Sequence, residues 1–66
     1  MKYRIREIRE SQKMPQYLLC RKSGVSRATI WALENKSDHV TTTKTLIKIA
    51  DALGVEPDEL FFASNA

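Results

Sequence analysis

One segment of the sequence has the pattern of a capped amphipathic helix: Val25-Ser26-Arg27-Ala28-Thr29-Ile30-Trp31-Ala32-Leu33-Glu34-Asn35. At about 100° per residue, Ser26, Ile30 and Leu33 fall together on a helical wheel and form an inward stripe. Ser26 also belongs to the residue types that favour the N-cap of a helix. The opposite arc is composed of small, basic, amide and indole side chains: Arg27, Ala28, Trp31, Ala32 and Asn35. The segment therefore predicts a helix whose outer face has almost no acidic charge.

A shorter apolar helix is predicted immediately before it, in Gln16-Tyr17-Leu18-Leu19-Cys20-Arg21-Lys22-Ser23-Gly24. Glycine adopts a left-handed conformation without strain, so Gly24 is a suitable stop for this helix. Two helices joined by a short glycine-containing turn, with a basic outer face on the second, form the layout of a helix-turn-helix. In that motif the second helix enters the major groove of DNA. Binding of double-stranded DNA is therefore the leading hypothesis.

The charges are distributed unevenly along the chain. The net charge is +3 and the sequence pI about 9.3, but residues 1–36 hold nine Lys/Arg and three Asp/Glu, whereas residues 37–66 hold two and five. A basic half joined to an acidic half favours a polyanionic partner on the basic side. An unevenly charged solvated surface is the alternative interpretation.

The composition argues against several other kinds of site. A single cysteine, Cys20, has no partner for an internal disulfide and is expected to be a small buried hydrophobe. The single histidine, His39, has no second His or Cys at ligand spacing, so neither a metal nor a cofactor is expected. The 66 residues suffice for one small core, and we expect a single domain without a small-molecule ligand. No apolar run approaches the roughly 20 residues that span a bilayer and no signal-peptide pattern is present, which predicts a cytoplasmic protein without membrane contact.

Helical periodicity, together with residues that typically start or end helices, predicts five helices. We place them at residues 2–12, 15–22, 26–35, 43–53 and 57–62. Pro15 and Pro57 suit the first turns of helices, and Gly24 and Gly54 suit their ends. Strand-type alternation and repeats are absent from the sequence, so the predicted class is a compact all-α fold. The expected core consists of apolar residues at helical spacing: Ile5, Ile8, Leu19, Val25, Ile30, Leu33, Leu46, Ile49, Leu53, Leu60 and Phe61.

With these helices placed, the chain resembles the Cro/C1-type (XRE-like) helix-turn-helix regulators, a family that includes small single-domain phage-repressor-like proteins. The resemblance covers nearly the whole chain and rests on motifs in family order: Arg4-Ile5-Arg6-Glu7-Ile8-Arg9, Gln16 with Leu19, Gly24-Val25-Ser26, Thr29-Ile30, Leu33-Glu34-Asn35, Thr45-Leu46-Ile47-Lys48-Ile49-Ala50-Asp51-Ala52-Leu53-Gly54-Val55 and Asp58-Glu59-Leu60-Phe61. It implies the compact five-helix lambda-repressor-like fold. It also implies a transcriptional regulator, in single-domain members typically a repressor, that binds a near-palindromic operator as a homodimer.

Three features depart from the family pattern. Pro15 stands where the family usually has Ser or Thr, which removes a side-chain cap and a hydroxyl for phosphate. Lys36 stands where Gly is common, and a non-glycine residue adopts a left-handed conformation only at a cost, so the path of the 36–42 loop is open. Leu18 and Trp31 are apolar where members of the family are mostly polar.

Residues on the outer arc of the predicted third helix are the candidate base contacts: Arg27, Ala28, Trp31 and Ala32. Arg27 can bond both O6 and N7 of guanine, although a phosphate contact or simple solvation is the alternative. The two alanines can contact thymine methyl groups, and helix propensity alone explains them nearly as well. Trp31 has three alternative interpretations: it packs on DNA, it contacts a protein partner, or it is partly buried beside Leu18.

Polar side chains around the presumed groove are the candidate phosphate contacts, which fix orientation without reading sequence. They are Gln16, Tyr17, Ser26, Thr29, Asn35 and Lys36. The resemblance also implies a structural ion pair between Arg9 and Glu34, each of which borders a core stripe. Phe62, beside a core phenylalanine on a short last helix, is the candidate dimer contact.

The sequence also bears on two functional classes other than DNA regulation. An antitoxin or protein-interaction module with secondary DNA binding is the alternative, with Leu18, Trp31 and Phe62 as its apolar surface. An enzyme is not expected, because the outer face of residues 26–35 carries no nucleophile–base pair and the chain has no glycine-rich phosphate loop.

Overall fold

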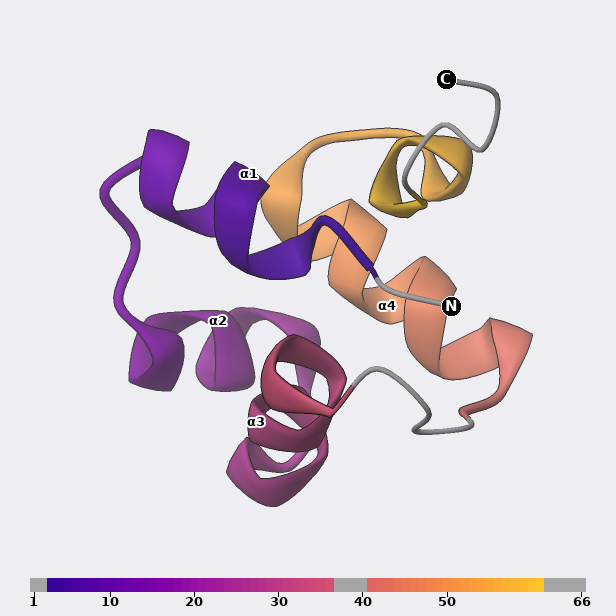
Figure 1. The fold of residues 1–66 in the computed structure, drawn as a ribbon, viewed down its shortest axis with the longest axis horizontal. Coiled ribbons are helices and arrows are strands. Elements are labelled where there is room, and N and C mark those ends of the chain that lie inside the picture. The colour runs from indigo at the N-terminus through magenta and orange to yellow at the C-terminus, as the bar shows by residue number, and fades with distance from the viewer. Residues whose placement is uncertain (1–2, 37–40, 62–66) are drawn as a thin grey trace.

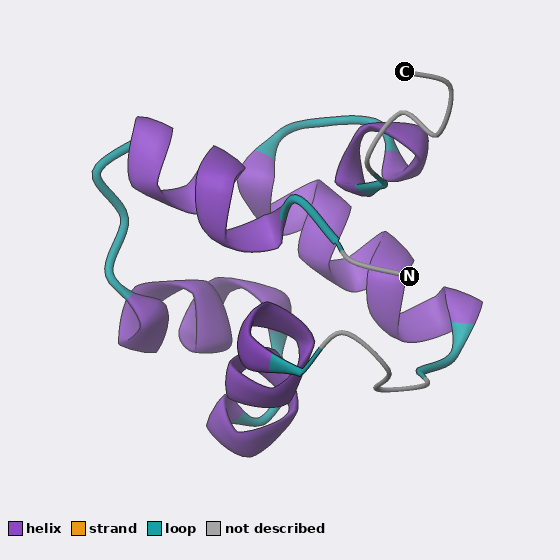
Figure 2. Ribbon diagram, viewed as in Figure 1, coloured by secondary structure: helices purple, strands orange, loops and turns teal. Residues whose placement is uncertain are grey.

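The computed structural model describes residues 3–36 and 41–61. These residues form four α-helices and one short 3₁₀ helix: α1 (Ile5–Ser11), α2 (Gln16–Ser23), α3 (Arg27–Asn35), α4 (Thr43–Leu53) and η1 (Pro57–Leu60). Figure 2 shows the helices joined by short loops, with no strand in the part of the chain that is described. The predicted all-α class is confirmed, but the fifth predicted element is a single 3₁₀ turn rather than an α-helix.

Side-chain caps and glycine stops set the ends of the helices. The hydroxyls of Ser26 and Thr42 accept hydrogen bonds from backbone amides in the first turns of α3 and α4, each at 3.2 Å. Gly24 and Gly54 follow α2 and α4 with φ of 74° and 73°, in the left-handed region where a side chain would be strained. Pro15 precedes α2 and provides no side-chain cap, as expected from its missing hydroxyl.

The core is built from every helical element. The five largest fully buried side chains each come from a different element: Ile5, Leu19, Ile30, Ile49 and Leu60. α4 packs against α1, α2 and η1, while α3 packs against α2 and α1. Figure 1 shows α2 and α3 together at the lower side of the molecule. The outer surface of α3 is therefore left uncovered by the other helices.

The two ends of the described chain are joined by an antiparallel bridge between Tyr3 and Phe61. The Arg4 amide donates to the Leu60 carbonyl at 2.6 Å, and the Tyr3 and Phe61 rings have centroids 5.5 Å apart. This pairing requires extended backbone, so α1 begins at Ile5 rather than at residue 2. For the same reason η1 ends at Leu60 rather than at residue 62, and Phe61 is half-buried instead of lying in the core. Phe62, the candidate dimer contact, lies outside the described residues.

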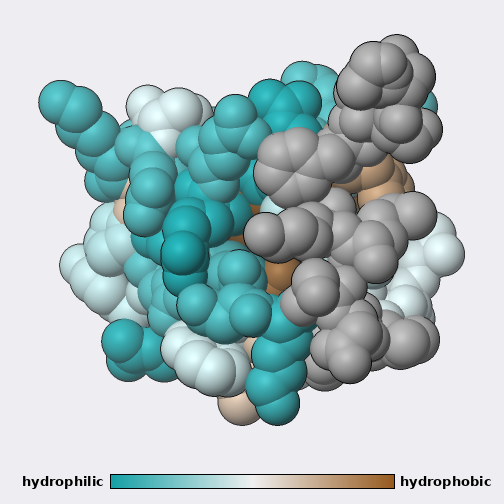
Figure 3. Space-filling view, in the orientation of Figure 1, coloured by the Kyte–Doolittle hydropathy of each residue, from teal (hydrophilic) through white to brown (hydrophobic). Residues whose placement is uncertain are grey.

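The surface of the molecule is mainly polar where it is described. Figure 3 shows hydrophilic side chains over most of the described part of one face, with hydrophobic atoms visible only in small areas. Exposed large apolar side chains are Tyr17, Trp31 and Ile47. Within residues 3–36 and 41–61, the structure contains no helix that is both long enough and apolar enough to cross a membrane.

Candidate nucleic-acid interface

α2, the turn of residues 24–26 and α3 form a compact unit. Val25 in the turn is buried, and its amide donates to the hydroxyl of the buried Ser23 at 3.2 Å. The side chain of Leu19 from α2 and that of Ile30 from α3 are both fully buried in the shared core. The orientation of α3 relative to α2 is therefore fixed by packing on both sides of the turn.

The outer face of α3 carries positive charge without exposed carboxylates. Arg27, Ala28 and Asn35 are exposed, and Trp31 is 50% exposed. The one acidic residue of α3 is Glu34, whose side chain is fully buried. Because the polyanionic surface of DNA repels carboxylates, a face that buries its single carboxylate is suited to that ligand.

One candidate base contact was placed wrongly from the sequence. Ala32 is only 9% exposed, so it does not belong to the outer face of α3. On a helical wheel it lies between Ala28 and Thr29, where periodicity predicts an outward side chain, so its burial results from the packing of α3 against α2 and α1. We therefore remove Ala32 from the candidate base contacts, while Arg27, Ala28 and Trp31 stay in the set.

The candidate phosphate contacts lie in different environments. Tyr17 and Lys36 are exposed, whereas Gln16 and Thr29 are half-buried. The Ser26 hydroxyl caps α3 and also donates to Oγ1 of Thr29 at 2.9 Å. These two hydroxyls are therefore occupied by each other in the absence of a ligand.

Lys36 shows how the loop after α3 begins without glycine. Its backbone is extended, with φ of −116° and ψ of 117°, and its amide donates to the Ala32 carbonyl at 2.8 Å. The left-handed conformation that favours glycine is therefore not used at this position, and lysine causes no backbone strain. The remainder of the loop, residues 37–40, lies outside the described part of the chain.

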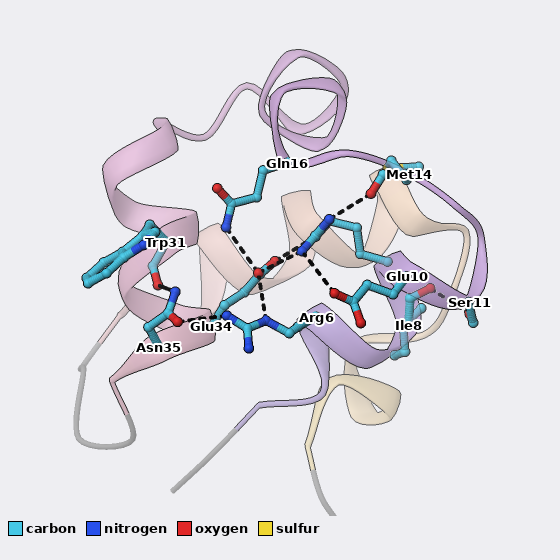
Figure 4. A network of polar contacts seen from close by, with 10 residues as sticks. Arg6, Ile8, Glu10, Ser11, Met14, Gln16, Trp31, Glu34 and Asn35 are labelled. Carbon is cyan, nitrogen blue, oxygen red and sulfur yellow. Dashed lines mark hydrogen bonds and ion pairs between the residues drawn. The ribbon is translucent and has the colours of Figure 1, made fainter.

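The buried carboxylate of Glu34 is the centre of a polar cluster, which we call the Glu34 cluster and which contains Arg6, Arg9, Gln16, Glu34 and Asn35 (Figure 4). Arg9 donates to both carboxylate oxygens, from Nε to Oε2 at 2.8 Å and from Nη2 to Oε1 at 2.9 Å. Gln16 Nε2 donates to Oε1 at 3.1 Å, and Arg6 Nε lies 3.5 Å from the same oxygen. The cluster thus connects α1, the first residue of α2 and the end of α3.

Comparisons with known proteins identify the family. A helix-turn-helix family model, HTH_3, matches residues 5–60. The chain belongs to the Cro/C1-type helix-turn-helix family. It is also similar to the crystal structure of the restriction-modification controller protein C.AhdI from Aeromonas hydrophila, with 33% sequence identity, a TM-score of 0.80, and coverage of 88% of this chain and 86% of that one. No curated protein matches the chain.

Membership of the Cro/C1-type family establishes the general function. Proteins of this family are DNA-binding transcription regulators and not enzymes, so the chain is a DNA-binding regulator. The Arg9–Glu34 ion pair implied by the family resemblance is present, with two short hydrogen bonds. Arg9 also donates from Nη1 to the Met14 carbonyl at 2.8 Å, so the same guanidinium ties the α1–α2 loop to α3.

The Glu34 cluster stabilises the charged forms of its members. Burial alone would raise the pKa of Glu34, but the hydrogen bonds from Arg9 and Gln16 and the charge of Arg9 outweigh it and lower that pKa below its ordinary value. The hydrogen bond to Glu34 raises the pKa of Arg9, despite the opposing effect of burial. Both partners are therefore ionised at neutral pH.

This lowered pKa predicts acid destabilisation that depends on Glu34. The unfolded chain binds a proton at this carboxyl near its ordinary pKa of about 4.3, whereas the folded chain binds it only at lower pH. The contribution to stability is therefore complete above the unfolded pKa and is lost as the pH falls through the folded pKa. Urea unfolding between pH 3 and 7 should show that the free energy of unfolding of the parent chain declines as the pH falls. The same decline should be smaller in Glu34→Gln. An identical decline in both proteins would contradict the role of Glu34.

Two participants in this region were not found from the sequence. Arg6 reaches Asn35 and Glu34 across almost half the chain, and no local periodicity signals a contact at that separation. Met14 precedes a proline and belongs to no helix, yet it is buried in the core. The one signal for Arg6 was its basic charge on the polar side of the predicted first helix.

Proposed function

We propose that the chain is a transcriptional repressor that binds a near-palindromic operator in double-stranded DNA as a homodimer and acts by occupying a promoter. The observation that carries the proposal is the uncovered outer face of α3, with Arg27, Ala28 and Trp31 exposed and its one carboxylate buried. A helix presented in this way fits the major groove. Similarity to a restriction-modification controller protein supports a regulatory role.

In this proposal the exposed side chains of α3 read the bases. Arg27 lies at the first position of α3 and can donate two hydrogen bonds to a guanine. Ala28 allows close approach of the helix and can contact a thymine methyl group. Trp31 offers a flat apolar surface and one N–H donor for sugar, methyl or phosphate groups.

The phosphate contacts in this proposal flank α3. Gln16 begins α2, where free backbone amides favour an anion, and Tyr17 follows it. Asn35 and Lys36 lie at the other end of α3. Ser26 and Thr29 contribute least, because their hydroxyls already bond each other.

The binding mode predicts both a spacing and a salt dependence. If two protomers place α3 in successive major grooves, the half-site centres should lie about 34 Å apart, one turn of DNA. If the dimer contacts roughly 6–10 phosphates, affinity should fall by about 10³–10⁵ between 50 and 200 mM salt. Selection from a random duplex pool, followed by salt titration, measures both quantities. Absence of duplex binding at low salt, or an affinity independent of salt, would contradict the proposal.

An antitoxin or protein-interaction role is the second candidate, supported by the half-exposed indole of Trp31. An aromatic side chain with this exposure is typical of a surface covered by another molecule. The two roles differ in the effect of Trp31→Ala. Loss of operator affinity assigns the indole to DNA, whereas unchanged operator affinity leaves it available to a protein partner.

A further inference from the structure

We propose that Arg6 of α1 is an additional phosphate contact, held in position by Asn35 and Glu34. The inference rests on the proposed docking of α3 in the major groove and extends it to a helix outside the helix-turn-helix. Neither the motif nor the outer face of α3 indicates a ligand contact from α1. The interactions of the Arg6 guanidinium indicate such a contact.

The Arg6 guanidinium is fixed at the end of α3. Its Nη2 donates to Oδ1 of Asn35 at 2.7 Å, and its Nε lies 3.5 Å from Oε1 of Glu34. Asn35 is itself fixed, because its Nδ2 donates to the Trp31 carbonyl at 2.8 Å. Figure 4 shows Arg6 between Glu34 and Asn35, with the third guanidinium nitrogen directed away from both. A guanidinium held at two of its nitrogens is preorganised, so little side-chain entropy is lost when it binds an anion.

The charge of Arg6 is not compensated within the Glu34 cluster. Arg9 donates two hydrogen bonds of 2.8 and 2.9 Å to the Glu34 carboxylate, and the Arg9 side chain is only 10% exposed. Arg6 adds a second positive charge to the same carboxylate through a longer contact, and its side chain is 49% exposed. The five residues of the cluster therefore carry one excess positive charge, and Arg6 is the more exposed of its two arginines. The Glu10 carboxylate lies 4.0 Å from Nη2 of Arg9 and forms no ion pair with Arg6. Among the described residues, Nη1 of Arg6 makes no hydrogen bond.

The position of Arg6 matches that of the proposed phosphate contacts. Gln16 and Arg6 contact the same oxygen of Glu34, so the start of α2 and the Arg6 guanidinium meet at one point. On its other side Arg6 bonds Asn35, which precedes Lys36. A DNA backbone that passes Gln16 and the end of α3 would also pass Arg6. Arginine is the side chain best suited to bind phosphate oxygens, because its planar guanidinium can donate two parallel hydrogen bonds.

The experiment measures operator affinity across a salt series for Arg6→Gln, Arg6→Lys and Arg4→Gln. Arg4→Gln is the matched control, because it removes the same charge beside the same helix. Arg4 pairs with Glu7 at 3.1 Å, and its amide bonds Leu60 rather than any residue of α3. Thermal unfolding of each variant verifies that the fold is retained, as expected for partly exposed side chains whose surface ion pairs contribute little to stability.

We expect Arg6→Gln to lower the slope of log affinity against log salt by about 0.9 per protomer. Its affinity at low salt should fall roughly tenfold, since a hydrogen bond to a charged group is lost. Arg6→Lys should restore most of the slope, because the charge is kept, and Arg4→Gln should leave the slope unchanged. An unchanged slope in Arg6→Gln, or equal losses in Arg6→Gln and Arg4→Gln, would overturn the role of Arg6 alone. Failure of the parent chain to bind duplex with salt-dependent affinity would instead overturn the proposed function.

Discussion

Replacement of Glu34 by alanine should destabilise the fold by about 3–5 kcal/mol, because it leaves a buried arginine charge without its partner. Arg9 is almost fully buried and directs two nitrogens at this carboxylate. A domain of this size has a total stability of roughly 5–15 kcal/mol, so the variant should lose a large fraction of it. Urea unfolding at neutral pH measures the loss directly.

A double-mutant cycle separates the pair from its surroundings. Arg9→Ala should cost a similar amount, and the double alanine variant should cost much less than the sum of the two. Replacement of both residues by well-packed apolar side chains, Arg9→Met with Glu34→Leu, should be tolerated. The exposed pair of Arg4 and Glu7 provides the matched control, for which Glu7→Ala should cost about 1 kcal/mol or less. Strictly additive losses for Arg9 and Glu34 would show that the two residues do not interact.

Arg27→Ala should change the sequence preference of the protein, and Lys36→Ala should not. Loss of a bidentate base contact costs about 1–3 kcal/mol and relaxes the preference at one position in each half-site. Loss of a phosphate contact weakens binding to all sequences alike and lowers the salt slope by roughly one unit per protomer. Selection from random duplexes with each variant, followed by titration of the selected and of scrambled sequences, measures both effects.

The contrary outcome for Arg27 is equally informative. If Arg27→Ala reduced every affinity by the same factor, Arg27 would be a phosphate ligand rather than a base reader. The reading of sequence would then pass to Trp31 and Ala28 through shape and methyl contacts. Ala32 no longer takes part in that alternative, because its methyl group is buried.

Local signals in the sequence are sufficient to predict most of this fold. The predicted helices 26–35 and 43–53 agree with α3 and α4 almost residue for residue, because the signals that bound them, Ser26, Thr42 and Gly54, act on adjacent residues. The errors occur where a distant contact overrides the local pattern. Tyr3 and Phe61 are extended since they pair with each other, and neither residue's neighbours in the sequence indicate that pairing.

The candidate site was predictable to a smaller extent, for the same physical reason. Helical periodicity correctly placed Arg27, Ala28 and Trp31 on the outside, because the angle around a helix depends only on sequence position. The exposure of Ala32 depends on which part of α3 the neighbouring helices cover. Helical periodicity carries no information about that packing. The contact between Arg6 and Asn35 depends on how α1 crosses α3, and it becomes visible only when the fold is known.

The half-exposed indole of Trp31 has a practical consequence. It belongs to the chain's single tryptophan, and Figure 4 shows it pointing away from the Glu34 cluster. The intrinsic fluorescence of the protein, when indole is excited selectively, therefore originates from one point on the outer face of α3. That emission reports the local hydration of this face without any attached label. The protein carries its own optical probe at the surface where a ligand is proposed to dock.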